Sequence, residues 1–149
     1  MNFQKTLFIT IVFVAFHSIA FCQKELYVNG KPINNTRCVE IKINSEDLSL
    51  IKEEAMPEIL DATITDDCLE VTLQHAGCGG NIELITDNKI NSSSKAKMNF
   101  KFNWIEKPTC NEKQQILVTF DLAPHKKIIQ DNKAVIYILG TGIVLKYKN

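Results

Sequence analysis

The stretch Cys68–Thr86 constrains the fold most, because it holds two alternating segments joined by a glycine-rich corner. Apolar and polar residues alternate over Cys68–Gln74 and again from Asn81 onward, which is typical of strands with one buried face. The corner, Gly77–Gly80, surrounds one cysteine with glycines, which permit positive φ angles and close backbone approach. The stretch therefore predicts a β corner pinned by a crosslink. The residues expected on its buried face are Leu69, Val71, Leu73, Ile82 and Leu84.

Two later segments, Met98–Trp104 and Ile116–Leu122, alternate in the same way and supply the main aromatic part of the predicted core. We expect Trp104 to be largely buried together with the phenylalanines of these segments. The residues predicted to point inward are Met98, Phe100, Phe102, Trp104, Ile116, Val118, Phe120 and Leu122, and those predicted to point outward are Asn99, Lys101 and Asn103.

Turn signals separate the remaining strands. Asn29-Gly30 supplies the two left-handed residues of a type I′ turn after Leu26–Val28, and Pro32 places this hairpin at a sheet edge. Further hairpins are predicted between Asp61–Thr65 and Cys68–Gln74, and between Ala134–Leu139 and Ile143–Tyr147.

Two segments interrupt this pattern. Ser45–Leu60 has helical spacing but contains Pro57, so it is either a short helix or an irregular loop, and Asn88–Lys97 is a polar loop. Because no long amphipathic helix is evident, we predict an all-β fold. Its expected architecture is an antiparallel β-sandwich or barrel of about seven to eight short strands, stapled by disulfides.

Residues 1–22 have the features of a secretory signal peptide. Lys5 is positive, Leu7–Ala15 is uncharged and apolar, and the small residues Ala20 and Cys22 precede an expected cleavage site. The apolar run is shorter than the roughly 20 residues of a membrane span. We therefore expect an extracytoplasmic protein, periplasmic or secreted, whose mature chain, residues 23–149, forms a single β-sandwich domain.

A bacterial lipobox is the alternative for the same segment. Ile19–Cys22 would then end in a lipidated Cys22, and the protein would be an outer-membrane lipoprotein. Phe21 is bulky where a lipobox requires a small residue, so cleavage before Gln23 is the favoured prediction. Contact with a membrane is expected only if Cys22 carries lipid.

The charge balance limits the kinds of partner. Seventeen basic and seventeen acidic residues give a net charge of zero, which argues against a nucleic-acid-binding protein. Residues 23–87 hold five basic and thirteen acidic residues, whereas residues 88–149 hold eleven and four. This division predicts complementary pairs between neighbouring strands, and a dipolar surface for a charged partner is the alternative.

Cysteine usage agrees with export. Removal of residues 1–22 leaves Cys38, Cys68, Cys78 and Cys110, an even number that suits two disulfides in an exported chain. Four cysteines allow three connectivities, and their spacing alone does not choose among them.

Several motifs together resemble a group of exported proteins of Bacteroidota, flavobacteria especially. The motifs are DCLEVTLQ at Asp67–Gln74, the Ala76-Gly77-Cys78 corner, Cys110, Phe120-Asp121-Leu122 and the closing segment Ile143–Tyr147. The group is similar, at a distance, to the carboxy-terminal half of the NigD-like lipoproteins, and the resemblance covers residues 61–149. It implies fold and compartment, and no established activity comes with it.

The chain departs from this group at three polar positions. Asn81, Asn103 and Pro108 stand where the group tends to have two histidines and an aspartate. A polar site built from those side chains is therefore not expected here.

The resemblance also bears on the disulfides. The resembling group has the pair that corresponds to Cys78 and Cys110, and both cysteines lie at predicted turns here. We therefore predict a Cys78–Cys110 bond. Cys38 and Cys68 remain, each opening an alternating strand, and they can bond if those strands are neighbours.

Candidate metal ligands are few. His75, Cys78, Cys110 and His125 could form a zinc site, but exported thiols are usually oxidised and the spacing matches no known ligand pattern. His75 is better explained as an inward strand residue and His125 as part of a polar loop.

Other catalytic and metal-binding patterns are equally weak. Asp61, Asp66 and Asp67 lack the Asp-x-Asp-x-Asp loop of a calcium site, and Ser92–Ser94 lacks a Gly-x-Ser-x-Gly setting. The sequence thus predicts no catalytic, cofactor-binding or metal-binding residue.

The absence of a convergent acid, base and nucleophile favours a non-catalytic secreted or cell-envelope module that binds an unknown protein or glycan. The alternatives are a small extracytoplasmic hydrolase or metal-dependent enzyme, and an inhibitor of a secreted hydrolase that inserts the Asn88–Lys97 loop.

Overall fold

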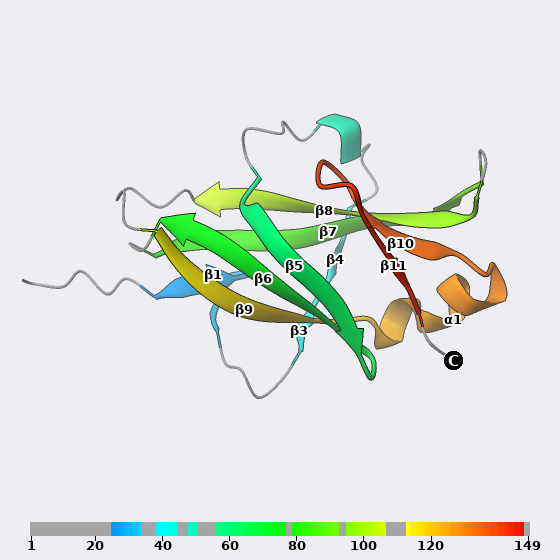
Figure 1. Cartoon of the computed structure of the whole chain (residues 1–149), viewed down its shortest axis with the longest axis horizontal. Helices are drawn as coiled ribbons and strands as arrows, with labels where there is room; N and C mark the ends of the chain where they lie inside the picture. Colours follow the sequence, from blue (N-terminus) through cyan, green and yellow to red (C-terminus); the bar gives the residue numbers. More distant parts are fainter. Residues whose placement is uncertain are drawn as a thin grey trace, which may run out of the picture.

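Two β-sheets that share one apolar core build the protein (Figure 1). The structure, a computed structural model, describes residues 25–33, 38–44, 48–50, 56–76, 79–92, 95–106 and 113–147. The larger sheet contains β1 (Leu26–Val28), β2 (Lys31–Pro32), β4 (Lys42–Ile43), β7 (Gly80–Asn91), β8 (Lys97–Glu106), β10 (Val135–Ile138) and β11 (Ile143–Lys146). The smaller sheet contains β3 (Val39–Glu40), β5 (Glu58–Thr65), β6 (Cys68–Ala76) and β9 (Lys113–Asp121).

The strand orders are β11-β10-β8-β7-β1-β2 in the larger sheet, where β4 also pairs with β7, and β3-β9-β6-β5 in the smaller sheet. Figure 1 shows β5, β6 and β9 lying across β7 and β8, with helix α1 (Ala123–Asp131) at one end. A short 3-10 turn, η1 (Leu48–Leu50), lies against β7.

The core confirms the predicted alternation. Phe102 of the larger sheet packs edge-to-face on Phe120 of the smaller sheet, with ring centroids 5.5 Å apart. Both sheets therefore bury the faces that the period-two pattern indicated. The predicted inward residues with no exposed surface are Leu69, Val71, Leu73, Ile82, Leu84, Met98, Phe100, Phe102, Phe120 and Leu122.

The prediction of an all-β fold is confirmed, but the sheets are mixed and hold eleven described strands rather than seven or eight. Antiparallel pairs such as β7–β8 and β6–β9 coexist with parallel pairs: β1–β7, β4–β7, β3–β9 and β10–β8. Parallel neighbours need a long crossover connection. Between β8 and β10 the chain passes through β9 in the other sheet and then α1, which provides that crossover.

The predicted hairpins are confirmed. Asp66, with φ of 54°, turns β5 into β6, and Gly140 and Gly142, with φ of 79° and 73°, turn β10 into β11. The β1–β2 hairpin ends the larger sheet, as Pro32 predicted.

The segment 38–44 joins the two sheets. Val39 pairs with β9 in the smaller sheet, Lys42 pairs with β7 in the larger one, and Ile41 between them is buried in the common core. The predicted disulfide between Cys38 and Cys68 is confirmed, with Cα atoms 6.0 Å apart. It forms although β9 lies between β3 and β6, so direct strand pairing was not required.

Two predicted orientations need correction. Trp104 points toward the core but is only partly buried, and its ring centroid lies 6.5 Å from that of His75. Lys101 was predicted to be solvent-exposed, but it is only 5% exposed. Its Nζ donates a hydrogen bond to the Leu48 carbonyl oxygen at 3.2 Å, because η1 covers this part of the outer face.

The predicted polar loop Asn88–Lys97 is also shorter than expected. Strand β7 continues to Asn91 and β8 begins at Lys97, because the Thr86–Ile90 irregularity keeps β7 paired with β8. Asn88 takes a left-handed φ of 54° at this bulge.

The uneven distribution of charge between residues 23–87 and residues 88–149 is only partly explained by ion pairs that join these two halves of the chain. Lys113–Glu58 and Lys126–Asp67 join the halves, whereas Lys42–Glu83 and Lys127–Asp131 each lie within one half. Several lysines of the carboxy-terminal half therefore remain outside the ion pairs found among the described residues.

Several predictions fall outside the described residues. They are the signal peptide at residues 1–22, the lipidated Cys22, the Cys78–Cys110 bond, the centre of the corner at Gly77-Cys78 and much of the Ser45–Leu60 segment, and they stay predictions.

Candidate functional site

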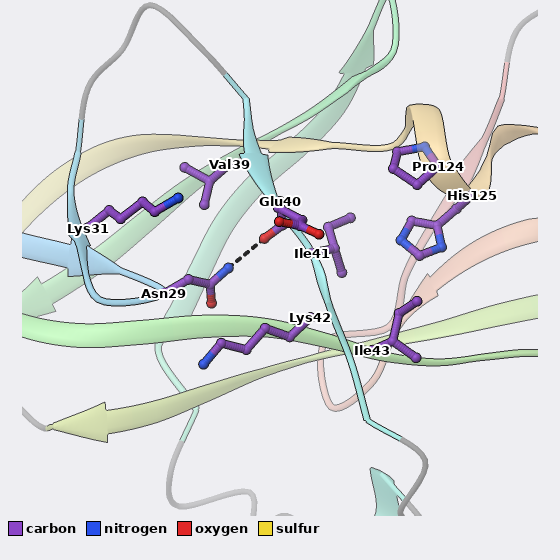
Figure 2. Close-up of a pocket in the computed structure, with 9 residues that line it drawn as sticks. All are labelled: Asn29, Lys31, Val39, Glu40, Ile41, Lys42, Ile43, Pro124 and His125. Carbon is purple, nitrogen blue, oxygen red and sulfur yellow. Dashed lines mark hydrogen bonds between the residues drawn. The ribbon is translucent and has the colours of Figure 1, made fainter.

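A cavity of about 460 Å³ opens where the β1–β2 turn, the segment 39–43 and the start of α1 meet (Figure 2). We call it the groove. Figure 2 shows Asn29 and Lys31 on the hairpin side, Pro124 and His125 on the helix side, and the segment 39–43 between them. The groove is lined by Asn29, Lys31, Val39, Glu40, Ile41, Lys42, Ile43, Pro124 and His125.

The β1–β2 turn holds the hairpin side of the groove in place. Asn29 and Gly30 have φ of 51° and 75°, as the type I′ turn requires. The Asn29 side-chain Nδ2 donates to the Glu40 carbonyl oxygen at 2.5 Å (Figure 2), and its backbone N–H donates to Ile82 at 2.9 Å. The Gly30 N–H donates to the Asn81 Oδ1 at 3.2 Å, so the Asn81 side chain anchors this turn on β7.

Helix α1 forms the opposite side, and here the sequence-based prediction was wrong. His125 was assigned to a polar loop, but it is helical and only 1% exposed. Pro124 in the first turn favours helix initiation, and the Asp121 Oδ1 accepts the Ala123 N–H at 2.8 Å. The spacing of Leu122, His125 and Ile129, all buried, is the helical signal that was available in the sequence.

His125 connects the helix to the larger sheet. Its Nδ1 lies 2.9 Å from the Asn88 Oδ1, and since an amide oxygen only accepts, Nδ1 carries the proton. Its ring meets the Phe100 ring edge-on at 5.9 Å. Burial lowers the pKa of His125 below its usual value of 6.5, although the Asp121 carboxylate acts in the opposite direction. The ring is therefore neutral at pH 7.

The lowered pKa of His125 predicts a loss of stability in mild acid. The unfolded chain takes up a proton near pH 6.5, so the stabilisation is present above that pH and is lost as the pH falls through the lower folded pKa. As the pH is lowered from about 7.5 to about 5, we expect the denaturation midpoint of the wild type to fall. The midpoint of His125→Gln should fall less over the same range. An equal fall in both proteins would exclude His125 as the cause.

Charged side chains flank an apolar surface along the groove. Ile43 is 62% exposed, and the neighbouring Lys42 forms an ion pair with Glu83 at 2.7 Å. Glu83 also accepts a hydrogen bond from the Asn103 Nδ2 at 3.0 Å. The groove thus offers an exposed aliphatic contact next to fixed charges, which is a typical composition for a binding surface.

The two candidate zinc ligands that the structure describes, His75 and His125, are not brought together, and Cys78 and Cys110 lie outside the described residues. His75 lies opposite Gln114 at the start of β9, whereas His125 follows the end of that strand. The strand from Gln114 to Asp121 rises about 3.3 Å per residue, so the two histidines are separated by more than about 20 Å, which is far too long for one metal ion. Within the described ranges, no group of three or more His, Cys, Asp or Glu side chains could hold a metal ion.

Asp67, considered above for calcium, has a different role. Its carboxylate accepts a hydrogen bond from the Tyr147 hydroxyl, and the Lys126 Nζ lies 2.9 Å away. The Asp67 carbonyl oxygen also accepts the Leu122 N–H at 2.8 Å. This cluster therefore ties the β5–β6 turn, α1 and the residue after β11 together at one end of the sandwich.

The same contacts change two pKa values. The hydrogen bond from Tyr147, and then the Lys126 ammonium, hold the pKa of Asp67 below its usual 3.8. Burial, and then the hydrogen bond to Asp67, raise the pKa of Tyr147 above its usual range.

Tyr147→Phe should raise the pKa of Asp67 toward 3.8, because it removes the largest cause of the shift. Asp67 stabilises the fold above its unfolded pKa and loses this contribution as the pH falls through its folded pKa, so the variant should be less sensitive to strong acid. Carboxyl NMR titration measures the shift. Tyr137→Phe is the matched control, since the Tyr137 ring lies beneath Lys97 instead. A pKa that does not move in Tyr147→Phe would contradict the contact.

Two further findings concern membrane-spanning helices and similarity to known proteins. None of the helices in the described part of the chain is both long and apolar enough to cross a membrane. Searches of protein-family models, curated proteins and solved structures find no match to this chain.

Proposed function

We propose that the protein is a non-catalytic, extracytoplasmic β-sandwich module, secreted or in the cell envelope, that binds a protein or glycan partner in the groove. The observation that carries this proposal is the exposed Ile43 within a cavity flanked by Lys31, Glu40 and Lys42. An exposed aliphatic side chain in a concave surface gains free energy when a partner covers it, and the flanking charges orient that partner.

The lining residues support binding over catalysis. The nine described lining residues include a histidine and a glutamate but no serine, threonine or cysteine. His125 also uses its Nδ1 to hold Asn88, which suits a structural role. The inhibitor alternative depended on a projecting Asn88–Lys97 loop, and the strands that occupy much of this segment leave that alternative without its main support.

A paired substitution tests the proposal. Ile43→Asp should abolish capture of the partner from an envelope extract, or of a glycan on an array. Val144→Asp is the matched control, because Val144 is a comparably exposed strand residue on β11, outside the groove. The proposal fails if neither protein nor glycan binds to the wild type, or if the two variants bind equally well.

Export itself predicts a defined amino terminus. We expect intact-mass measurement of the exported protein to give a chain that begins at Gln23, because Ala20 and Cys22 satisfy the small-residue requirement of the peptidase. A diacylglycerol on Cys22 would instead identify an anchored lipoprotein. Retention of residues 1–22 would contradict export.

A further inference from the structure

A second cavity, of about 290 Å³, lies at the other end of α1 from the groove. Its walls come from the end of α1, the start of β10 and the end of β11, together with Lys95 just before β8. We call it the lysine pocket. It is lined by Lys95, Ile129, Gln130, Lys133, Ala134, Val135, Lys146 and Tyr147.

Three lysines line this pocket without a described counter-ion. The ion pairs among the described residues involve Lys42, Lys113, Lys126 and Lys127, and none involves Lys95, Lys133 or Lys146. Asp131 at the end of α1 pairs with Lys127, and Asp67, which contacts the pocket-lining Tyr147, pairs with Lys126. The pocket therefore has a local excess of positive charge, although the net charge of the chain is zero.

The strand register concentrates this charge. Val135 of β10 lies opposite Lys146 on β11 and opposite Lys97 on β8, and such neighbours have Cβ atoms about 5 Å apart. Lys97 places its Nζ 5.0 Å from the centroid of the Tyr137 ring, beside the pocket. Lys97 and Lys146 thus flank Val135, which lines the pocket together with the buried residues Ile129 and Ala134.

We propose that the lysine pocket binds a phosphate monoester, with the carbon skeleton of the ligand against Val135 and Ala134. A phosphate monoester carries nearly two negative charges at neutral pH and accepts several hydrogen bonds, so it matches three lysines better than a single carboxylate does. The cavity is at the small end of ligand pockets, which suits a headgroup rather than a polymer.

The pocket is independent of the proposed function. The groove is lined by Pro124 and His125 near the start of α1, whereas the lysine pocket is lined by Ile129 and Gln130 near its end. A failure of one site therefore leaves the other untouched.

Two probes distinguish a soluble phosphate monoester from a lipid headgroup that carries the same group. Glycerol 3-phosphate tests a soluble ligand, and vesicles that contain phosphatidic acid test a lipid headgroup with the same phosphate monoester. Glycerol and phosphatidylcholine vesicles are the matching negative probes. Binding to the purified protein is followed by amide NMR titration and by vesicle co-sedimentation at low ionic strength, because salt screens exposed charges.

The decisive variant is Lys95→Gln/Lys133→Gln/Lys146→Gln. Its control is Lys89→Gln/Lys113→Gln/Lys127→Gln, which removes the same charge from exposed lysines elsewhere. Thermal melts monitored by circular dichroism verify that both variants fold.

We expect the pocket variant to weaken binding by about tenfold or more and the control by about twofold or less. Loss of glycerol 3-phosphate binding in the pocket variant supports a soluble ligand, and loss of binding to phosphatidic acid vesicles alone supports a lipid headgroup. The proposal is overturned if the wild type binds neither probe, if both variants weaken equally, or if the pocket variant binds as well as the wild type.

Discussion

Phe102→Ala should lower the free energy of unfolding by about 3 to 5 kcal/mol, which is a large part of the stability of a domain of this size. Phe102 has no exposed surface and packs edge-to-face on Phe120 across the two sheets. Its truncation removes buried apolar area and leaves a cavity between sheets that are held by their own backbone hydrogen bonds. The surrounding structure can therefore collapse only partly onto the gap.

Urea denaturation followed by Trp104 fluorescence measures this loss. Leu117→Ala is the control, because Leu117 lies on the adjacent strand β9 but is 46% exposed, and we expect a change of about 0.5 kcal/mol or less. A loss below about 1 kcal/mol in Phe102→Ala would show that the two sheets do not pack through this face.

Replacement of both Cys38 and Cys68 by serine should destabilise the protein by about 3 to 4 kcal/mol. The two cysteines are 30 residues apart in the sequence, and their bond restricts the unfolded chain. It also holds the start of the segment 38–44, which pairs with both sheets and forms one side of the groove. We therefore expect partner binding in the groove to weaken together with stability.

Denaturation of the wild type with and without reductant provides the matching measurement. In the presence of reductant, the wild type and the double variant should unfold at similar denaturant concentrations, because both then lack every disulfide. Non-reducing peptide mapping should recover a peptide that joins Cys38 to Cys68 and tests the predicted Cys78–Cys110 bond at the same time. A peptide that joins Cys38 to Cys78 would refute both pairings.

Local patterns predicted the strands, their buried faces and the tight turns. Each of these features depends on neighbours a few residues away: the alternation of Met98–Trp104 selects the face that is buried, and Asn29-Gly30 selects the turn. The same local logic was available for α1, where Leu122, His125 and Ile129 repeat at helical spacing. The polar residues around His125 led to the prediction of a loop at this position, where the structure has a short amphipathic helix.

Strand partners could not be predicted in the same way. An alternating pattern states which face is buried but not which strand lies alongside, so the parallel pairs of β7 with β1 and β4 had no signal in the sequence. Lys101 is a related case. Its position in the strand predicts an outward side chain, and only the later placement of η1 over that face buries it.

The sequence by itself determined the all-β class and the buried face of each main strand, because alternation and turn chemistry act over short distances. Only the tertiary structure decided the mixed sheets, the groove and the lysine pocket. The groove needs the β1–β2 turn, the segment 39–43 and α1 to meet, and the lysine pocket needs β10 to lie between β8 and β11. Contacts between such distant elements depend on how two twisted sheets pack to bury a common core. This packing is a property of the whole chain rather than of any one segment.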